Sequence, residues 1–144
     1  MTNDITALLP HRKPFLFVDR IEKADKNEIV GYKRFPLTEF FFAGHFPEYP
    51  VVPGVILIET MAQCGGAGVK LVPELATEGF FFLASVEKTK FRRQVRPDDE
   101  VRIVIANLRV TKTTVKQSGK AYVGDELAAE AEWLCIRGNP PTQS

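Results

Sequence analysis

The sequence predicts one α+β domain in which a curved antiparallel sheet wraps around a single long helix. The first reason is length, because 144 residues fit one domain better than two. The second is the stretch 55–72, which is apolar nearly all round, as in a helix that is buried rather than lying on a surface. The third is the set of short apolar segments, separated by turn residues, that follows the helix and is typical of antiparallel strands.

The N-terminal region predicts a short helix and two strands. Asp4 can cap a helix at 5–9, which Pro10 ends because proline cannot continue the helical hydrogen-bond ladder. Apolar residues then predict strands at 15–21 and 28–35. A loop rich in glycine and proline leads from the second strand to the long helix.

The long apolar stretch is predicted to begin near Pro53, which can occupy the first helical turn, and to end at Pro73. Each glycine inside it costs about 1 kcal/mol of helix propensity relative to alanine, and close approach of another backbone is one reason to tolerate that cost. The residues 54–72 approach the length of a membrane span. Glu59 and Gln63 lie among them, however, and a carboxylate at membrane depth is expensive, so a buried helix is favoured.

Four strands are predicted after the helix, beyond a polar turn at 73–79. They span 80–91, 100–110, 111–123 and 126–136, with Gly119 and the pair at 124–125 as turns. The domain is therefore expected to cover residues 1–137. Residues 138–144, which include two consecutive prolines, are expected to form a disordered tail.

Composition and charge exclude several classes of protein. The formal net charge is only +1, whereas nucleic-acid-binding domains usually carry a clear basic excess. The N-terminus lacks the basic region and apolar run of a secretory signal. Cys64 and Cys135 form no CxxC motif and are expected to be buried free thiols, which suits a reducing cytosol. We therefore expect a cytoplasmic protein without a membrane span.

One segment, AGHFPEYPVVPGVILIETMAQ at 43–63, holds the residues best suited to chemistry. Its histidine, His45, lies in a loop stiffened by Pro47, Pro50 and Pro53. A lone histidine is most often structural. A rigid loop nevertheless holds a side chain at small entropic cost, which suits a general base.

Glu59 is a carboxylate within an otherwise apolar helix, where an unpaired charge is costly. It is either a partner in a buried ion pair or a general acid that its apolar surroundings keep protonated. Gln63 lies one helical turn further on the same face. It can support the carboxyl of Glu59 by a hydrogen bond or serve as an ordinary polar residue of the helix.

The start of the helix offers main-chain donors that have no partner within the helix. Because Pro53 has no N–H, Gly54 and Val55 supply the first of them. Such donors, at the positive end of the helix dipole, can polarise a carbonyl oxygen. The presence of Gly54 is equally well explained by the turn that it permits.

The motif HFPEYPVVPGV at 45–55, followed by Glu59 and Gln63, resembles the signature of the 3-hydroxyacyl-[acyl-carrier-protein] dehydratases of type II fatty acid synthesis. The segment LLPHRKPFLFVDR at 8–20 is similar to the N-terminal motif of that family, and KFRRQVRP at 90–97 is similar to a third block. The resemblance covers nearly the whole chain. It implies a hotdog fold and a homodimer, often a trimer of dimers, with each active site shared between two subunits.

The resemblance also implies the reaction, the dehydration of 3-hydroxyacyl groups carried by acyl carrier protein. The N–H of Gly54 would bind the thioester oxygen, His45 would take a C2 proton, and Glu59 would protonate the departing C3 hydroxyl. No metal or organic cofactor is expected, since His11 and His45 show no metal-ligand spacing. His11 is expected to be structural. Glu59 favours the broad-range, dehydration-only class, because the related isomerising dehydratase is longer and carries aspartate there.

Two further groups of residues each have two interpretations. The phenylalanines at 40–42 and 80–82 could line an acyl tunnel or could belong to the ordinary core. A basic cluster could be a solvated face or a docking surface for the acidic acyl carrier protein. This cluster consists of Lys88, Lys90, Arg92, Arg93 and Arg96.

Two rival functions remain beside the dehydratase. A hotdog acyl thioesterase would use the carboxylate of the helix with water, and it would not need His45 in its proline-framed loop. A non-catalytic acyl-binding module would be indicated by the loss of His45 or Glu59, and both residues are present.

Overall fold

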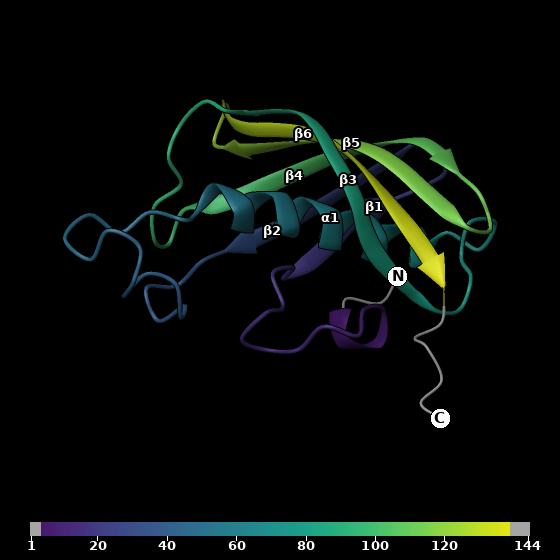
Figure 1. Ribbon diagram of the computed structural model, residues 1–144, viewed down its shortest axis with the longest axis horizontal. Coiled ribbons are helices and arrows are strands. Elements are labelled where there is room, and N and C mark those ends of the chain that lie inside the picture. Colours follow the sequence, from purple (N-terminus) through teal and green to yellow (C-terminus); the bar gives the residue numbers. More distant parts are fainter. Residues whose placement is uncertain (1–3, 139–144) are drawn as a thin grey trace.

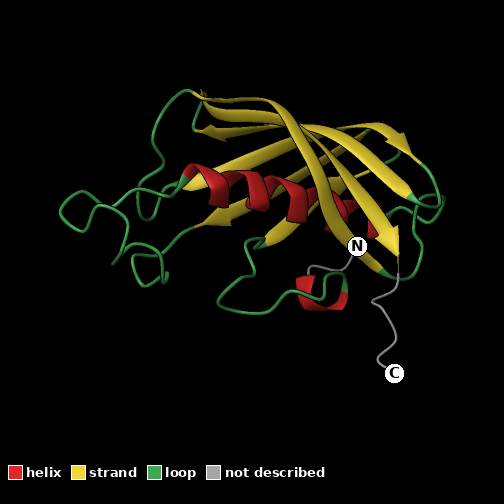
Figure 2. Cartoon of the chain, viewed as in Figure 1, coloured by secondary structure: helices red, strands yellow, loops and turns green. Residues whose placement is uncertain are grey.

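One helix lies under a curved six-stranded antiparallel sheet in the computed structural model, which describes residues 4–138 (Figure 1). Figure 2 shows how the strands arch over the helix, so that one face of the sheet covers it. The sheet order is β1-β2-β4-β5-β6-β3. The elements are η1 (Ile5–Ala7), β1 (Arg20–Ala24), β2 (Glu28–Arg34), α1 (Gly54–Leu71), β3 (Phe80–Phe91), β4 (Glu100–Val110), β5 (Thr114–Val123) and β6 (Glu126–Gly138). The predicted α+β architecture is therefore confirmed.

Strands β3 and β4 have the bounds that the sequence predicts, and β2 ends one residue earlier. Strand β6 is longer than predicted, since it continues to Gly138 and pairs there with Phe80 of β3. Gly138 therefore belongs to the sheet and not to the expected tail at 138–144. The remainder of that tail lies outside the described residues.

The predicted strand at 15–21 is wrong over most of its length, because β1 begins only at Arg20. The side-chain amide of Gln63 binds the backbone of this segment instead. Its Oε1 accepts the N–H of Phe17 at 2.8 Å, and its Nε2 donates to the carbonyl of Phe15 at 3.0 Å. Backbone groups that are bonded to a helix side chain are not available to a neighbouring strand.

The predicted end of the first helix and the predicted start of the second are also adjusted. The helix expected at 5–9 is a single 3-10 turn, in which the side chain of Asp4 accepts the N–H of Thr6 as expected of a cap. It ends early because Pro10 has no N–H with which to continue the ladder. Pro53 stands just before α1 and not in its first turn, since its ψ of 140° is extended.

Strand β5 begins later than predicted and contains a glycine that we expected in a turn. Residues Thr111 and Thr114 close a tight turn, in which the N–H of Thr111 donates to the carbonyl of Thr114 at 2.8 Å. Gly119 lies within β5, where a Cβ atom would come within 2.8 Å of the Trp133 ring. The glycine therefore makes room for an aromatic side chain. The predicted turn at 124–125 is confirmed, with Gly124 at a φ of +58°.

The glycines of α1 allow side chains of the sheet to lie directly against the main chain of the helix. A Cβ atom at Gly65 would collide with the amide of Gln117 on β5, and one at Gly68 would collide with Ile29 on β2. Close approach of another backbone was one possible reason for these glycines, and at Gly65 and Gly68 the neighbours are side chains instead. The facing strands approach through their side chains, because a sheet carries side chains on both faces.

The helix is a core element of the protein. Met61, Cys64 and Ala67 on α1 have no exposed surface. Among residues 4–138, no helix combines the length and the apolar character needed to cross a membrane. Cys64 and Cys135 are both buried and unpaired, which confirms the expectation of free thiols.

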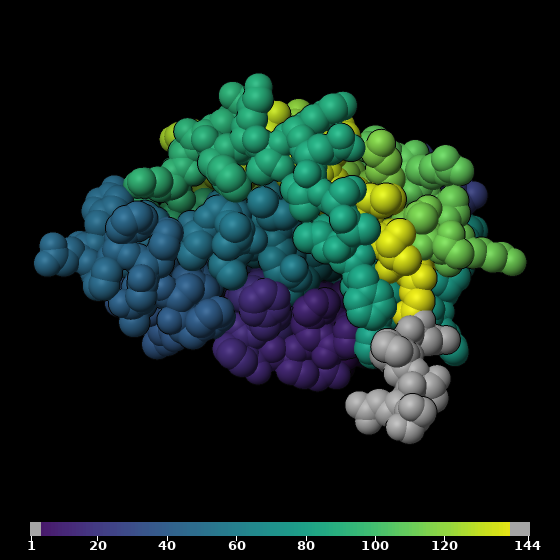
Figure 3. Space-filling view, in the orientation of Figure 1, coloured from purple at the N-terminus to yellow at the C-terminus, as the bar shows by residue number. Residues whose placement is uncertain are grey.

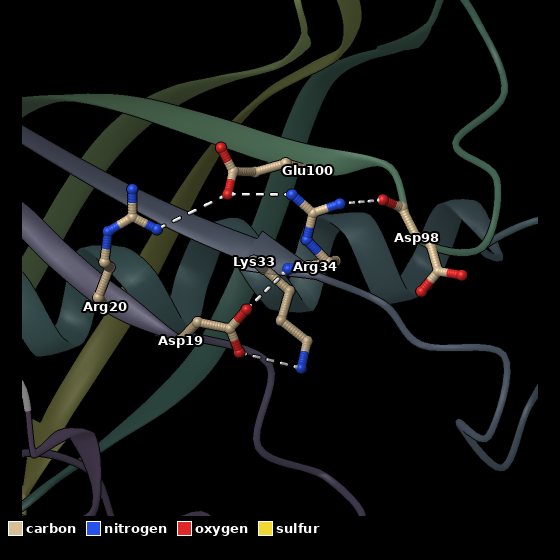
Figure 4. Close-up of polar contacts among 6 residues, drawn as sticks. All are labelled: Asp19, Arg20, Lys33, Arg34, Asp98 and Glu100. Carbon is tan, nitrogen blue, oxygen red and sulfur yellow. Dashed lines mark hydrogen bonds and ion pairs between the residues drawn. The ribbon is translucent and has the colours of Figure 1, made fainter.

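Charged side chains hold the segment before β1 to its neighbours (Figure 4). Asp19 accepts the main-chain N–H of Arg34 at 2.8 Å and lies 3.4 Å from the ammonium group of Lys33. The side chain of Lys33 is only 8% exposed and also faces Glu39 at 3.3 Å, so its charge is paired within the fold. Arg34 lies 3.4 Å from Glu100 of β4. These contacts fix the N-terminal segment beside β2.

Candidate active site

The sheet leaves one side of α1 partly uncovered. Val55 is exposed, and Ile58, Glu59 and Ala62 are half-buried, whereas the residues between them are buried. The spacing of three and four residues places these side chains on one stripe of the helix. Glu59 therefore lies at the margin of the core, with its side chain 23% exposed.

Gln63 fixes the orientation of Glu59. Its Nε2 donates to Oε2 of Glu59 at 2.8 Å, in addition to the carbonyl of Phe15, while its Oε1 accepts the N–H of Phe17. The main-chain N–H of Phe17 can only donate and the main-chain carbonyl of Phe15 can only accept, so the side-chain amide of Gln63 has one possible orientation. Gln63, which is itself held by the main chain of Phe15 and Phe17, thus fixes the position of Oε2 of Glu59.

A small cavity of about 60 Å³ lies beside this carboxylate. Residues of the N-terminal segment, α1, β3 and β6 line it: Leu9, His11, Glu59, Ala62, Gln63, Gly66, Phe81, Leu83 and Cys135. Of the phenylalanines with two interpretations, Phe81 is at this cavity, whereas Phe41 and Phe42 belong to the core. The pKa of the Cys135 thiol is raised to about 11, mainly by burial and to a smaller extent by the nearby Glu59. This thiol is therefore no nucleophile at neutral pH.

His45 has one ring nitrogen fixed by the protein. Its Nδ1 lies 3.0 Å from the carbonyl oxygen of Val51, and the main-chain N–H of His45 donates to the carbonyl of Phe41 at 3.0 Å. A carbonyl oxygen can only accept, so Nδ1 carries the ring hydrogen. The lone pair of a neutral ring is then on Nε2, which is the atom able to take up a proton.

The loop that carries His45 runs from β2 to α1. It projects beyond the N-terminal end of the helix, where it is drawn in blue (Figure 1 and Figure 3). Phe46 stands next in the loop with a φ of +54°, which is rare for a bulky residue. The rings of His45 and Phe46 lie 4.5 Å apart. Phe46 is 63% exposed, so this end of the loop is open to solvent.

The structure does not bring His45 and Glu59 together within one chain. Among residues 4–138, no hydrogen bond or ion pair joins them, and His45 is absent from the lining of the cavity beside Glu59. The polar neighbours of Glu59 are Gln63 and His11, whose Nε2 lies 3.6 Å from Oε2 of Glu59.

The start of α1 is shaped by Phe91 of β3. A Cβ atom at Gly54 would lie 2.8 Å from the Phe91 ring, so a larger residue there would displace that ring. The carbonyl of Pro53 accepts the N–H groups of Ile56 and Leu57, at 3.0 and 3.2 Å. The N–H groups of Gly54 and Val55 precede the helical ladder and have no hydrogen-bond partner among residues 4–138, so they can donate to another acceptor.

The basic cluster is partly balanced by carboxylates. Arg92 lies 3.1 Å from Glu130 of β6, and its hydrogen bond lowers the pKa of that carboxyl. Arg93 lies 3.8 Å from Asp99 and 3.6 Å from Glu126. The other residues differ in their contacts: Lys88 pairs with Glu132, Lys90 is near Glu130, and the guanidinium of Arg96 stacks over the Tyr49 ring at 4.1 Å.

No group of three or more histidine, cysteine, aspartate or glutamate side chains that could hold a metal ion occurs within the described part of the chain. Of the predicted site residues, Glu59 and Gln63 are in contact and line one cavity, whereas His45, Gly54 and Val55 are not part of its lining. His11 is a residue whose contact the sequence did not reveal. The one signal for it was its place in the LLPHRKPF motif.

Residues 9–132 match the family described as the FabA-like domain. The chain belongs to this FabA-like family. A protein of Pelotomaculum thermopropionicum described as "3-hydroxyacyl-[acyl-carrier-protein] dehydratase FabZ" is 49% identical over 133 residues, which are 92% of this chain and 94% of that protein. A protein of Desulforamulus reducens with the same description is 49% identical over 137 residues, covering 94% of this chain and 96% of its own.

Solved structures bear on the fold of this FabA-like protein. The dehydratase heterocomplex ApeI:P from Xenorhabdus doucetiae contains a chain with a TM-score of 0.78 and 13% identity, covering 94% of this chain and 91% of its own. The structure of zebra fish thioesterase superfamily member 2 has a TM-score of 0.62 and 8% identity, and the match covers 83% of this chain and 80% of that one. At these identities the likeness concerns the fold alone. The hotdog fold that the resemblance implied is confirmed.

Proposed function

We propose that this protein removes water from (3R)-3-hydroxyacyl groups on acyl carrier protein and yields trans-2-enoyl groups during fatty acid elongation. The observation that carries the proposal is 49% identity to proteins described as 3-hydroxyacyl-[acyl-carrier-protein] dehydratases, over more than nine-tenths of the chain. The expected domain, residues 1–137, contains the whole of the matched region 9–132.

The proposed chemistry uses an acid, a base and main-chain donors. The N–H groups of Gly54 and Val55 hold the thioester oxygen, where negative charge grows as a C2 proton leaves. Nε2 of His45 takes that proton. Glu59 gives a proton to the C3 hydroxyl, the C3–O bond breaks, and water departs. His45 is left protonated and Glu59 ionised, so both must exchange a proton with solvent before the next turnover.

We also propose that the active unit is at least a homodimer, with His45 and Glu59 of one site supplied by different subunits. Two observations support this. Within one chain no contact between the described residues joins the pair, and β3 is an edge strand with β6 on one side only. Phe82, Leu83 and Phe91 on β3 are 46%, 43% and 52% exposed, so a second copy could pair with this apolar edge. A trimer of such dimers is compatible with the fold.

The carrier protein is proposed to dock on Lys90, Arg92, Arg93 and Arg96. The support is a local basic cluster in a chain whose net charge is +1. Neighbouring carboxylates reduce the field of this cluster, so we expect it to guide the encounter more than to determine affinity. We place the enzyme in the cytoplasm, because its two unpaired thiols are typical of a reducing compartment.

The experiment that tests the activity runs the reaction in reverse. Crotonoyl thioester is incubated with the protein, and the loss of enoyl absorbance is followed as water adds across the double bond. Product analysis then separates the dehydratase from its rival, because a hydratase product is a 3-hydroxyacyl thioester and a thioesterase product is a free acid. Release of free acid without hydration would contradict the proposal.

A further inference from the structure

His11 of the N-terminal segment lies beside the proposed catalytic acid, Glu59 of α1. Its Nε2 lies 3.6 Å from Oε2 of Glu59, the same oxygen that accepts a hydrogen bond from Gln63. Its other ring nitrogen, Nδ1, is buried and has no hydrogen-bond partner among the described residues. Two different elements, the N-terminal segment and α1, thus present a nitrogen to one carboxylate oxygen.

The tautomer of His11 follows from these surroundings. A neutral imidazole has a single N–H, and at Nδ1 that N–H would have nothing to donate to. At Nε2 it points toward the carboxylate of Glu59, which accepts. The separation of 3.6 Å is longer than a hydrogen bond, but contacts of this kind are often long before substrate binds and tighten in the complex.

The position of His11 is fixed by Arg12, which ties the turn together. The guanidinium group of Arg12 donates to three main-chain carbonyls, those of Thr6, Leu9 and His11, at 3.1, 2.8 and 2.7 Å. Leu9 is buried in the core, so the turn is anchored on both sides of Pro10.

We propose that His11 is a positioning residue for Glu59: together with Gln63 it keeps Oε2 as an acceptor, so that the transferable proton of the acid is on Oε1. An oxygen that receives two N–H donors has no room for a hydrogen of its own. The proton is then on the oxygen that is free to meet the C3 hydroxyl. This inference rests on the proposed role of Glu59 as the general acid.

Two variants separate the donor from the ring. His11→Phe keeps a ring of similar size and removes the donor, and His11→Gln places an amide nitrogen at about the same reach. We expect His11→Phe to lower kcat about tenfold, the effect of one hydrogen bond to the carboxylate that forms as Glu59 gives up its proton, with KM changed less than about twofold. His11→Gln should recover kcat to within about threefold of the original protein, since it restores a donor to Oε2.

A double variant tests whether His11 acts through Glu59. In a Glu59→Gln background, His11→Phe should reduce the residual kcat by less than about twofold, because the group it positions is already gone. If His11→Phe does not fold, as judged by circular dichroism, His11→Ala with added imidazole replaces it. Imidazole should then restore kcat to His11→Ala and leave the double variant with Glu59→Gln unchanged.

Four other outcomes would contradict the proposed role of His11, and each has its own meaning. Unchanged kcat in His11→Phe means that the contact is not used. Equal losses in His11→Phe and His11→Gln mean that the ring is needed for a reason other than its donor. No rescue of His11→Ala by imidazole means that an N–H donor at this place does not support turnover. A further loss in the Glu59→Gln background means that His11 acts elsewhere. If Glu59→Gln alone retained full turnover, the proposed function of Glu59 would fail, and this inference would fall with it.

Discussion

At the scale of single residues, each proposed catalytic side chain has one atom bound to the protein and one atom left free. Val51 holds Nδ1 of His45, and Gln63 holds Oε2 of Glu59. In both cases the remaining atom, Nε2 or Oε1, is the one that can exchange a proton with a substrate. Such preorganisation fixes the rotamer of the group before the reaction begins.

We predict that His45→Ala and Glu59→Gln each lower kcat by about 10²–10⁴, the usual range for a positioned base or acid. Steady-state hydration of crotonoyl thioester measures the effect. Circular dichroism should show that both variants fold, because His45 is in a loop and Glu59 is at the margin of the core. A variant with near-normal turnover would show that its residue has been given the wrong role.

The site was predictable from the sequence only where partners are close in the chain. The hydrogen bond between Gln63 and Glu59 follows from their spacing of one helical turn. The bonds from Gln63 to Phe15 and Phe17, and the contact of His11 with Glu59, cross between elements far apart in sequence. Periodicity holds no information on such contacts, because they depend on how the N-terminal segment crosses the helix.

At the scale of elements, the bounds of β3 and β4 agree with the prediction. The segment 15–19 is as apolar as a strand, but the amide of Gln63 takes its hydrogen-bonding groups. The error at Gly119 has a similar origin, since a glycine in a strand and a glycine in a turn look alike until Trp133 is seen beside it.

The packing of β5 on β6 gives a stability prediction. Gly119→Ala should lower the free energy of unfolding by about 1–3 kcal/mol, because its methyl group would overlap the Trp133 ring in a filled core. Gly44→Ala is the matched control, as nothing lies within 4 Å of its Cβ position. Urea unfolding of the two variants measures the difference. Equal stability of both would show that the Trp133 ring moves aside freely.

The basic cluster beside β3 gives a prediction on the carrier protein. Reversal of both charges in Arg92→Glu/Arg93→Glu should raise KM for carrier-bound substrate and spare small thioesters such as the coenzyme A form. Added salt should weaken the preference of the original protein for carrier-bound substrate. Kinetics with the two substrates, at low and high salt, provide the measurement.

The control for this experiment is Lys26→Glu/Lys112→Glu, which changes the net charge equally at two exposed turns outside the cluster. It should leave both KM values nearly unchanged. If Arg92→Glu/Arg93→Glu impaired turnover of both substrates equally, the cause would be damage to the fold, because Glu130 and Asp99 lose their ion-pair partners in this variant.

At the scale of the whole molecule, the proposed sharing of each site between subunits can be tested by mixing two inactive proteins. In a dimer of one His45→Ala chain and one Glu59→Gln chain, one site receives both original residues and the other receives neither. With random exchange about half of the dimers are mixed, so activity should return to roughly a quarter of the original. A site built within one chain would give no recovery.

Subunit exchange must be demonstrated independently of activity. Native mass spectrometry of the mixture, with one variant isotopically labelled, reports the share of mixed dimers. Background activity in a sample that has exchanged would disprove the shared site while leaving the roles of His45 and Glu59 intact. Recovery in proportion to the mixed fraction would show that each site is shared between two subunits.

The pairing of β3 with β6 also has a consequence for the order in which the chain can fold. Strand β6 is the last element among residues 4–138, so during synthesis β3 leaves the ribosome well before β6, the strand that pairs with it. Until then the apolar side chains of β3 have no strand beside them, and the wall of the cavity next to Glu59 is incomplete. The single tryptophan, Trp133, is on β6 and is 1% exposed once that strand is in place. Its fluorescence therefore reports the closing step of folding, when the sheet is completed over the helix.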